Sequence, residues 1–181
     1  LTSFSIELQK QMQALDEKTS LSTIPLYSSN HIDFTAGSLV QTGRTLDVGM
    51  QGPGYLTLET PNGPVYTRSG SLDVNQRRQL VDTAGRIVAG ANGPINIPTE
   101  IAVADISIAN DGTLSANGIS LGQMKVVEFG DQDDQLSPAG LGAFKAPDTV
   151  KPKAAADTKV KQGYREGSNV KIVEELINMM T

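Results

Sequence analysis

The side chains that could perform chemistry are few in this sequence. His31 is its only histidine, and none of the 181 residues is a cysteine. Catalytic triads need a histidine base, and zinc sites usually take several histidine or cysteine ligands. We therefore interpret His31 as a structural or exposed residue, and the lack of thiols excludes disulfides and cysteine nucleophiles.

A glycine-rich segment at residues 49–54, GMQGPG, superficially matches a phosphate-binding loop. Its glycines follow the order GxxGxG, no Lys-Ser or Lys-Thr pair accompanies them, and the next residues are typical of a strand. Phosphate loops instead lead into a helix whose N-terminus faces the phosphate. The segment therefore predicts a sharp turn between two strands.

The densest acidic cluster is DQDD at residues 131–134. A calcium loop of the EF-hand kind that starts at Asp131 needs glycine at its sixth position and glutamate at its twelfth. Those positions hold Leu136 and Gly142, so we expect a solvated loop and no metal. A hydrolase is the alternative ranked last, and it would use Asp131, Asp133 or Asp134.

Apolar residues recur at helical spacing at both ends of the chain, which predicts an amphipathic helix at each end. The N-terminal stripe is Leu1, Phe4, Leu8, Met12 and Leu15. The C-terminal stripe is Val170, Val173, Ile177 and Met180, with Ser168 or Asn169 as N-cap. Such a helix either packs on its own domain or forms half of a coiled-coil-like pair.

The residues between the two stripes are typical of β-structure. Short β-prone runs alternate with turn signals such as Pro61-Asn62-Gly63-Pro64 and Asn110-Asp111-Gly112. The runs are residues 55–60, 65–68, 80–81, 86–88, 106–109, 113–116 and 119–129, and Asp105 marks a bulge or break. The fold class is therefore mainly β, a compact domain of short antiparallel strands inserted between N- and C-terminal helical arms.

The predicted organisation has three parts. Residues 1–36 form the N-terminal helix and a connector, residues 37–147 the β-rich domain, and residues 148–181 a second connector and the start of the C-terminal helix. Residues 148–161 are expected to be an extended connector. The chain starts at Leu1 rather than methionine and stops at Thr181 inside an apolar stripe, so we expect a fragment of a longer protein.

Composition excludes several classes of partner. Lys and Arg total 15 against 20 Asp and Glu, a net charge of −5 that does not suit nucleic acid. No apolar run reaches the length of a membrane span, and residues 1–18 lack the basic start and apolar block of a secretory signal. Aromatic residues make up 4 %, so the core is expected to be aliphatic.

Four segments of the β-rich part and its borders form an ordered set of motifs. They read GSLVQTGRTLDVGMQGPGY at residues 37–55, YTRSGSL at 66–72, ISIANDGTL at 106–114 and KQGYREGSNV at 161–170. In this order they resemble the shared motifs of bacterial flagellar basal-body rod and hook proteins. No single motif is specific, but four in sequence are.

Within that family, GPINIP at residues 93–98 is more similar to the proximal rod protein than to the distal rod protein. The compact middle section argues against the hook protein. A distal rod or hook-type axial protein is the alternative. The sequence departs from the family pattern at Pro53, where Gly or Asp is common, and at Arg78, where a turn glycine is common.

The resemblance implies a structural subunit of the rod, the drive shaft that transmits torque across the periplasm. It implies assembly with other rod and hook subunits, passage through the flagellar export apparatus without a cleaved signal peptide, and a place in the basal body. It implies no enzyme activity, cofactor, nucleic-acid binding or membrane insertion. The fragment is expected to be monomeric and the full-length protein oligomeric, because the family's outermost helices, which build the rod's inner tube, are missing here.

The residues expected to act are of two kinds. The assembly interface is Leu8, Met12, Leu15, Val170, Val173, Ile177 and Met180. The turn motif is Gly37, Gly43, Asp47, Gly52 and Gly54, with Asp47 satisfying nearby backbone donors. The remaining alternative is a carbohydrate-binding β module that would stack sugars on Tyr55, Tyr66 and Tyr164.

Overall fold

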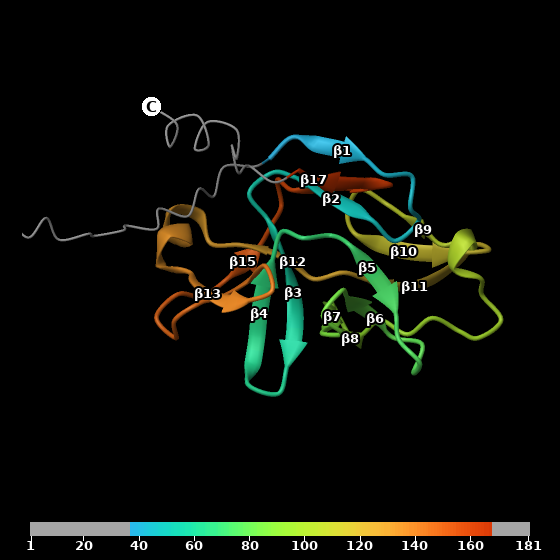
Figure 1. Ribbon diagram of the computed structural model, residues 1–181, viewed down its shortest axis with the longest axis horizontal. Helices are drawn as coiled ribbons and strands as arrows, with labels where there is room; N and C mark the ends of the chain where they lie inside the picture. Colours follow the sequence, from blue (N-terminus) through green and yellow to red (C-terminus); the bar gives the residue numbers. More distant parts are fainter. Residues whose placement is uncertain (1–36, 168–181) are drawn as a thin grey trace, which may run out of the picture. The chain divides into compact units, whose positions relative to one another are not determined.

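The computed structural model describes residues 37–167, and these fold almost entirely as short β-strands (Figure 1). The mainly β, antiparallel fold class is thus confirmed. Both predicted terminal helices lie outside the described residues, as does His31. The helices within residues 37–167 are the 3₁₀ turns η1 (Val103–Asp105) and η2 (Gly130–Gln135), and neither is long and apolar enough to cross a membrane.

The largest sheet has ten strands and grows outward from one hairpin. Its centre is β3 (Tyr55–Thr60) and β4 (Gly63–Thr67), joined by the predicted tight turn. The strand order runs β13 (Ser137–Gly140), β14 (Ala143–Lys145), β4, β3, β7 (Ile87–Gly90), β6 (Leu80–Asp82), β5 (Leu72–Val74). β12 (Val126–Glu128) also pairs with β3 and carries β15 (Lys153–Ala154), and β8 (Gly93–Pro94) pairs with β7.

Three smaller sheets complete the described part of the chain. β9 (Ser107–Ile108), β10 (Thr113–Ala116) and β11 (Ile119–Gln123) form a meander. β2 (Val48–Gln51) pairs with β16 (Lys159–Gln162), and β1 (Leu39–Gln41) pairs with β17 (Tyr164–Glu166). The last two pairs join the beginning of the described chain to its end, so local hairpins are closed by long-range pairing.

The segment expected to be an extended connector, residues 148–161, contributes to these sheets. It contains β15 and most of β16, and Val160 in β16 is 1 % exposed. A local pattern cannot reveal this pairing, because the partner strand β2 lies more than a hundred residues earlier in the chain. The three-part division at residues 36 and 147 stays a prediction.

Two apolar clusters hold the sheets together. The larger is aliphatic, as composition predicts, and includes Val48, Leu56, Leu72, Leu80, Ile95 and Leu114. The smaller gathers Tyr55, Tyr66, Val127, Phe129, Leu136 and Val150. Its rings meet edge to face, with Tyr66 and Phe129 centroids 4.8 Å apart, an arrangement that aromatic pairs favour.

Two local departures have a physical explanation. The predicted break at Asp105 is the 3₁₀ turn η1. Arg78, where the family pattern has a glycine, adopts a left-handed φ of 61°. Its guanidinium donates hydrogen bonds to the carbonyls of Ile97, Pro98 and Ile101, which stabilise the arginine in this unfavourable backbone region.

Candidate functional site

The two ends of the described chain meet at the β1–β17 pair. Gly167 N–H donates to the Ser38 carbonyl at 2.8 Å, and Gly37 N–H donates to Glu166 Oε1 at 2.5 Å. A Cβ on Gly37 would lie 2.3 Å from the Gly167 carbonyl oxygen, so only glycine permits this approach. Residues 37 and 167, where the described chain begins and ends, therefore lie side by side.

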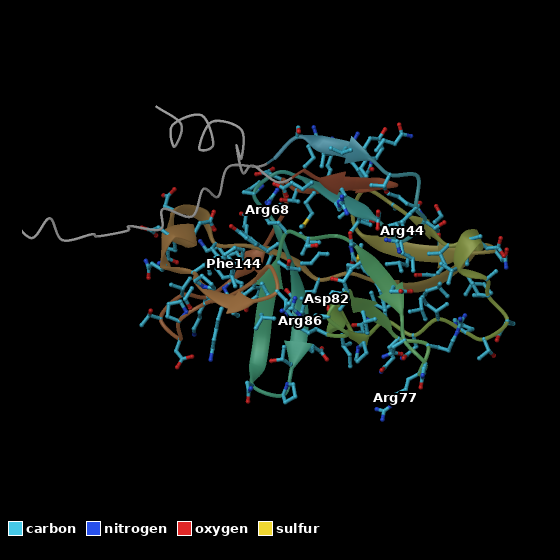
Figure 2. The ribbon with its side chains drawn as sticks, viewed as in Figure 1. Arg44, Arg68, Arg77, Asp82, Arg86 and Phe144 are labelled. Carbon is cyan, nitrogen blue, oxygen red and sulfur yellow. The ribbon has the colours of Figure 1, made fainter. Side chains whose placement is uncertain are left out.

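Arg68, directly after β4, connects the β1–β17 pair to the rest of the domain (Figure 2). Its Nε lies 2.8 Å from Glu166 Oε2, and both side chains are largely buried at 14 % and 12 % exposure. Its Nη1 donates to the carbonyls of Gly52 and Gly54 at 3.0 and 2.8 Å. The guanidinium also lies 5.7 Å from the centre of the Tyr55 ring. One planar cation thus joins three of the four sequence motifs.

Gln162 forms a second connection between distant motifs. Its Nε2 donates to the carbonyls of Thr45 and Ile106, each at 2.9 Å, and its Oε1 accepts from Ile108 N–H at 3.0 Å. A side-chain amide suits this position because it offers donors and an acceptor together. We call Arg68, Glu166 and Gln162 the junction residues. They tie the start and the end of the described chain to the β domain.

The predicted turn glycines surround the junction residues. Gly43 and Gly52 adopt φ values of 71° and 126°, which L-residues with a side chain rarely adopt. Gly54 is constrained by contact instead, because a Cβ there would lie 2.7 Å from Thr158 Oγ1. Gly37 faces Gly167, as described above.

Asp47 has a different partner from the one expected. We expected its carboxylate to satisfy backbone donors, whereas Oδ1 accepts from Arg44 Nη1 at 3.1 Å. Asp47 is 1 % exposed, and its own carbonyl accepts from Gly163 N–H. The residue therefore reaches the fourth motif through its backbone.

The tyrosines proposed for sugar stacking are placed unfavourably for that task. Tyr55 and Tyr66 are 1 % and 5 % exposed and belong to the aromatic cluster, and Tyr164 is half-buried in β17. Burial raises the pKa of Tyr66. The pKa of Tyr55 is raised to about 12, mainly by burial and to a smaller extent by the nearby Asp133 carboxylate. The enclosed rings of Tyr55 and Tyr66 cannot stack on a sugar, so only the partly exposed Tyr164 remains of the three tyrosines on which the carbohydrate alternative depends.

The acidic cluster forms the 3₁₀ turn η2 rather than a binding loop. Asp131 and Asp134 are exposed, while Asp133 is half-buried with an Oδ1 that accepts no hydrogen bond from the described residues. Burial raises the pKa of Asp133, and the Arg68 cation opposes that effect. Within residues 37–167, no group of three or more acidic, histidine or cysteine side chains could hold a metal ion. The three aspartates therefore do not converge on one site.

The junction residues lie inside the sequence motifs, but the motifs themselves predict no role for them. Arg68 lies in YTRSGSL, and both Gln162 and Glu166 lie in KQGYREGSNV. A signal exists only for Arg68, which is the single charged residue within the small and turn-forming residues of YTRSGSL. The pairing of Arg68 with Glu166 was not predictable, because the two residues are 98 positions apart in the chain.

The matches to protein families cover both halves of the junction. Residues 49–116 match the family model described as the flagellar hook protein FlgE/F/G D1 domain, and this range contains Arg68. Residues 161–181 match the model of the flagellar basal body rod FlgEFG protein C-terminal region, which contains Gln162 and Glu166. Each half of the junction is therefore part of a recognised family segment.

Individual relatives give the same result. The chain is 35 % identical over 171 residues to the flagellar basal-body rod protein FlgF of Salmonella typhimurium, covering 87 % of this chain and 66 % of the relative. It is 34 % identical to FlgF of Escherichia coli over the same shares, and 33 % identical to the rod protein FlgG of Agrobacterium fabrum, covering 81 % and 59 %. The chain thus spans slightly less than two thirds of the length of these relatives.

Motif order, the two matched segments and the junction that connects them agree with one another. Such a combination does not arise from one short motif, and its two matched segments, residues 49–116 and 161–181, lie far apart in the chain. The chain belongs to the flagellar basal-body rod protein family, in the group that includes FlgF and FlgG.

Proposed function

We propose that the protein is a structural subunit of the bacterial flagellar rod, the drive shaft that transmits torque across the periplasm. The observation that carries the proposal is the junction, where the first and last strands of the described chain pair with each other and are joined to one β domain. A subunit that assembles through its ends needs such an attachment. Without it, force on the ends would peel the outer strands from the domain.

The junction provides a continuous path for force. Tension on the segment after residue 167 acts first on the β1–β17 hydrogen bonds. Glu166 passes the load to Arg68, which is held by carbonyls of the turn between β2 and β3. Charge-assisted and forked hydrogen bonds are the strong ones in proteins, so the guanidinium spreads load over several segments.

The assembly contacts themselves belong to the flanking segments in this proposal. The stripes Leu8, Met12, Leu15 and Val170, Val173, Ile177, Met180 pack against neighbouring subunits in a helical tube. Repeated contacts that do not close on themselves produce a filament. The β domain braces neighbours at larger radius.

Further properties follow from the family and are proposed with it. The partners are other rod and hook subunits and the export apparatus, which passes the protein without a cleaved signal peptide. The subunit acts mechanically and catalyses no reaction. The chain 1–181 is monomeric by itself, and the full-length protein is oligomeric.

The position in the rod is proposed to be proximal. The motif GPINIP at residues 93–98 favours this position. Sequence identity does not separate the two groups, because FlgF relatives of 26–35 % identity overlap FlgG relatives of 31–33 %. A distal or hook-type axial position is the second candidate, because the matching family model includes FlgE and FlgG as well as FlgF.

The decisive experiment changes the C-terminal stripe in the complete gene. Val173→Asp with Ile177→Asp places two charges on the proposed seam and should abolish swimming when it replaces the wild-type gene. The matched control Asn178→Asp adds a charge beside the seam and should swim normally. The melting temperature of chain 1–181 should not change with either variant, because the β domain ends before both sites. Normal swimming of the double variant would refute the assembly proposal.

A further inference from the structure

A groove of about 670 Å³ lies beside the junction residues. Its lining includes the last three described residues, Arg165, Glu166 and Gly167, together with Arg68. Gly37, the first described residue, donates its N–H to the Glu166 carboxylate and therefore lies next to the same groove. The groove is thus within reach of the few residues that precede Gly37 or follow Gly167.

The rest of the lining is one aromatic ring among short side chains. Phe144 in β14, labelled in Figure 2, is half-buried and packs against the smaller apolar cluster, with its ring centre 6.4 Å from that of Tyr55. The other members are Ser69, Ser71, Thr83 and Gly142. Short side chains leave space, and an aromatic ring offers a surface against which a second ring packs edge to face. The groove therefore suits one large apolar side chain.

The groove also carries one unbalanced positive charge. Arg68 and Glu166 neutralise each other, because their side chains form an ion pair. Arg165 is exposed, and no carboxylate among residues 37–167 forms an ion pair with it. An occupant that brings an apolar ring and a negative charge together therefore matches this groove best.

The two flanking segments differ in what they bring to the groove. Phe34 lies three residues before Gly37 and directly follows Asp33, so two adjacent residues supply both a ring and a carboxylate. Three residues span at most about 10 Å, which is similar to the width expected of a groove of this volume. Residues 168–171 contain no aromatic residue, and Lys171 would add to the positive charge. Reach allows either segment, and chemistry favours the one before Gly37.

We propose that Asp33 and Phe34 of the same chain occupy this groove, with the Phe34 ring against Phe144 and the Asp33 carboxylate facing Arg165. Both occupants lie outside the described residues. The contact attaches the N-terminal segment to the β domain and so sets the direction in which that segment leaves it. The inference goes beyond the proposed function and does not depend on it, because every contact lies within one chain.

Nuclear magnetic resonance tests the contact directly in chain 1–181. The sequence has four phenylalanines and four tyrosines, so the ring signals can be assigned with single substitutions. Nuclear Overhauser effects are expected between the ring protons of Phe34 and Phe144, and Phe34→Ala should shift the amide signals of Ser69 and Gly142. A Phe34 ring that shows no Overhauser effect to any residue of the groove would overturn the proposal.

Thermal unfolding adds a matched control. Phe34→Ala should lower the melting temperature of chain 1–181 by about 4 °C, the change expected for loss of one partly enclosed side chain. Phe4→Ala makes the same substitution in the N-terminal stripe and should leave the melting temperature nearly unchanged. Equal effects of the two substitutions would contradict docking of Phe34.

A pair of charge changes tests the contact between Asp33 and Arg165. Asp33→Asn and Arg165→Gln should each lower the melting temperature by about 1–2 °C. The double variant should be no less stable than Arg165→Gln, because either single change already removes the pair. Strictly additive losses would overturn the charge contact. None of these failures would affect the rod function, which the swimming test of Val173→Asp with Ile177→Asp addresses separately.

Discussion

Arg68 and Arg86 make the same kinds of interaction but connect different parts of the domain. Each pairs with a largely buried carboxylate and donates to backbone carbonyls of another segment. Arg86 and Asp82 are four residues apart, across one tight turn, whereas Arg68 and Glu166 are separated by most of the domain. The first pair orients a surface loop, and the second closes the fold at the point where the chain leaves it.

The comparison shows that the consequence of an ion pair depends on what its partners connect. Asp82 also accepts hydrogen bonds from the backbone N–H groups of Ala84 and Arg86, so its charge is stabilised twice. Glu166, at the end of the described chain, accepts from Gly37 at its beginning and from Arg68, 98 residues earlier. Removal of Arg68 should therefore cost more than removal of Arg86, and should act over a larger part of the structure.

Arg68→Ala is expected to have the largest effect. It leaves the Glu166 carboxylate largely buried and deprives the Gly52 and Gly54 carbonyls of a donor. Loss of one partner from a buried pair typically costs about 3 kcal/mol or more, and urea unfolding of chain 1–181 measures the cost. Hydrogen exchange should accelerate in β1 and β17. Arg68→Lys should recover only part of the loss, because an ammonium lacks the planar fork. A free energy of unfolding equal to that of wild type would show that the Arg68–Glu166 pair does not stabilise the domain.

Tyr55, whose ring lies beneath Arg68, is expected to make the free energy of unfolding depend on pH under alkaline conditions. Its pKa is raised from 10.0 to about 12, mainly by burial, so the folded protein keeps the phenol neutral after the unfolded chain has ionised. The unfolded state then binds fewer protons, and stability falls as pH rises from 10 to 12, by up to about 1.4 kcal/mol per pH unit.

Urea unfolding at a series of pH values checks this dependence. Tyr55→Phe should reduce the slope between pH 10 and 12, whereas Tyr66→Phe controls for the second buried phenol, whose pKa is also raised. An identical slope in Tyr55→Phe and wild type would show that ionisation of Tyr55 does not cause the loss of stability above pH 10.

Arg86→Ala is expected to have the smallest effect of the three. The Asp82 carboxylate keeps its two backbone donors, and the carbonyls of Gly140 and Leu141 are exposed enough to bind water. A loss of about 1 kcal/mol in urea unfolding is expected, with faster hydrogen exchange confined to β13 and β14. A loss as large as that of Arg68→Ala, or faster exchange in β1 and β17, would erase the distinction between the two arginines.

Much of the local structure follows from residue type alone. The hairpin β3–β4, the β6–β7 turn and the β9–β10–β11 meander appear where turn residues separate β-prone runs. Such elements are decided by neighbours in sequence, so short patterns suffice. The aliphatic core follows in the same way from the low aromatic content. The motif order was enough to identify the family, which the matched segments confirm.

The tertiary structure alone decided how distant motifs combine. The motif KQGYREGSNV does not predict that Glu166 accepts hydrogen bonds from Gly37 and Arg68. It also does not predict that Gln162 donates to the carbonyls of Thr45 and Ile106. The sequence predicts a connector at β16 for the same reason, because these residues form a strand only by pairing with the distant strand β2. The sequence by itself determined the hairpins, the glycine turns and the family, because these depend on local backbone preference. Which buried charge meets which chain end depends on pairing across more than a hundred residues, and only the folded chain sets that.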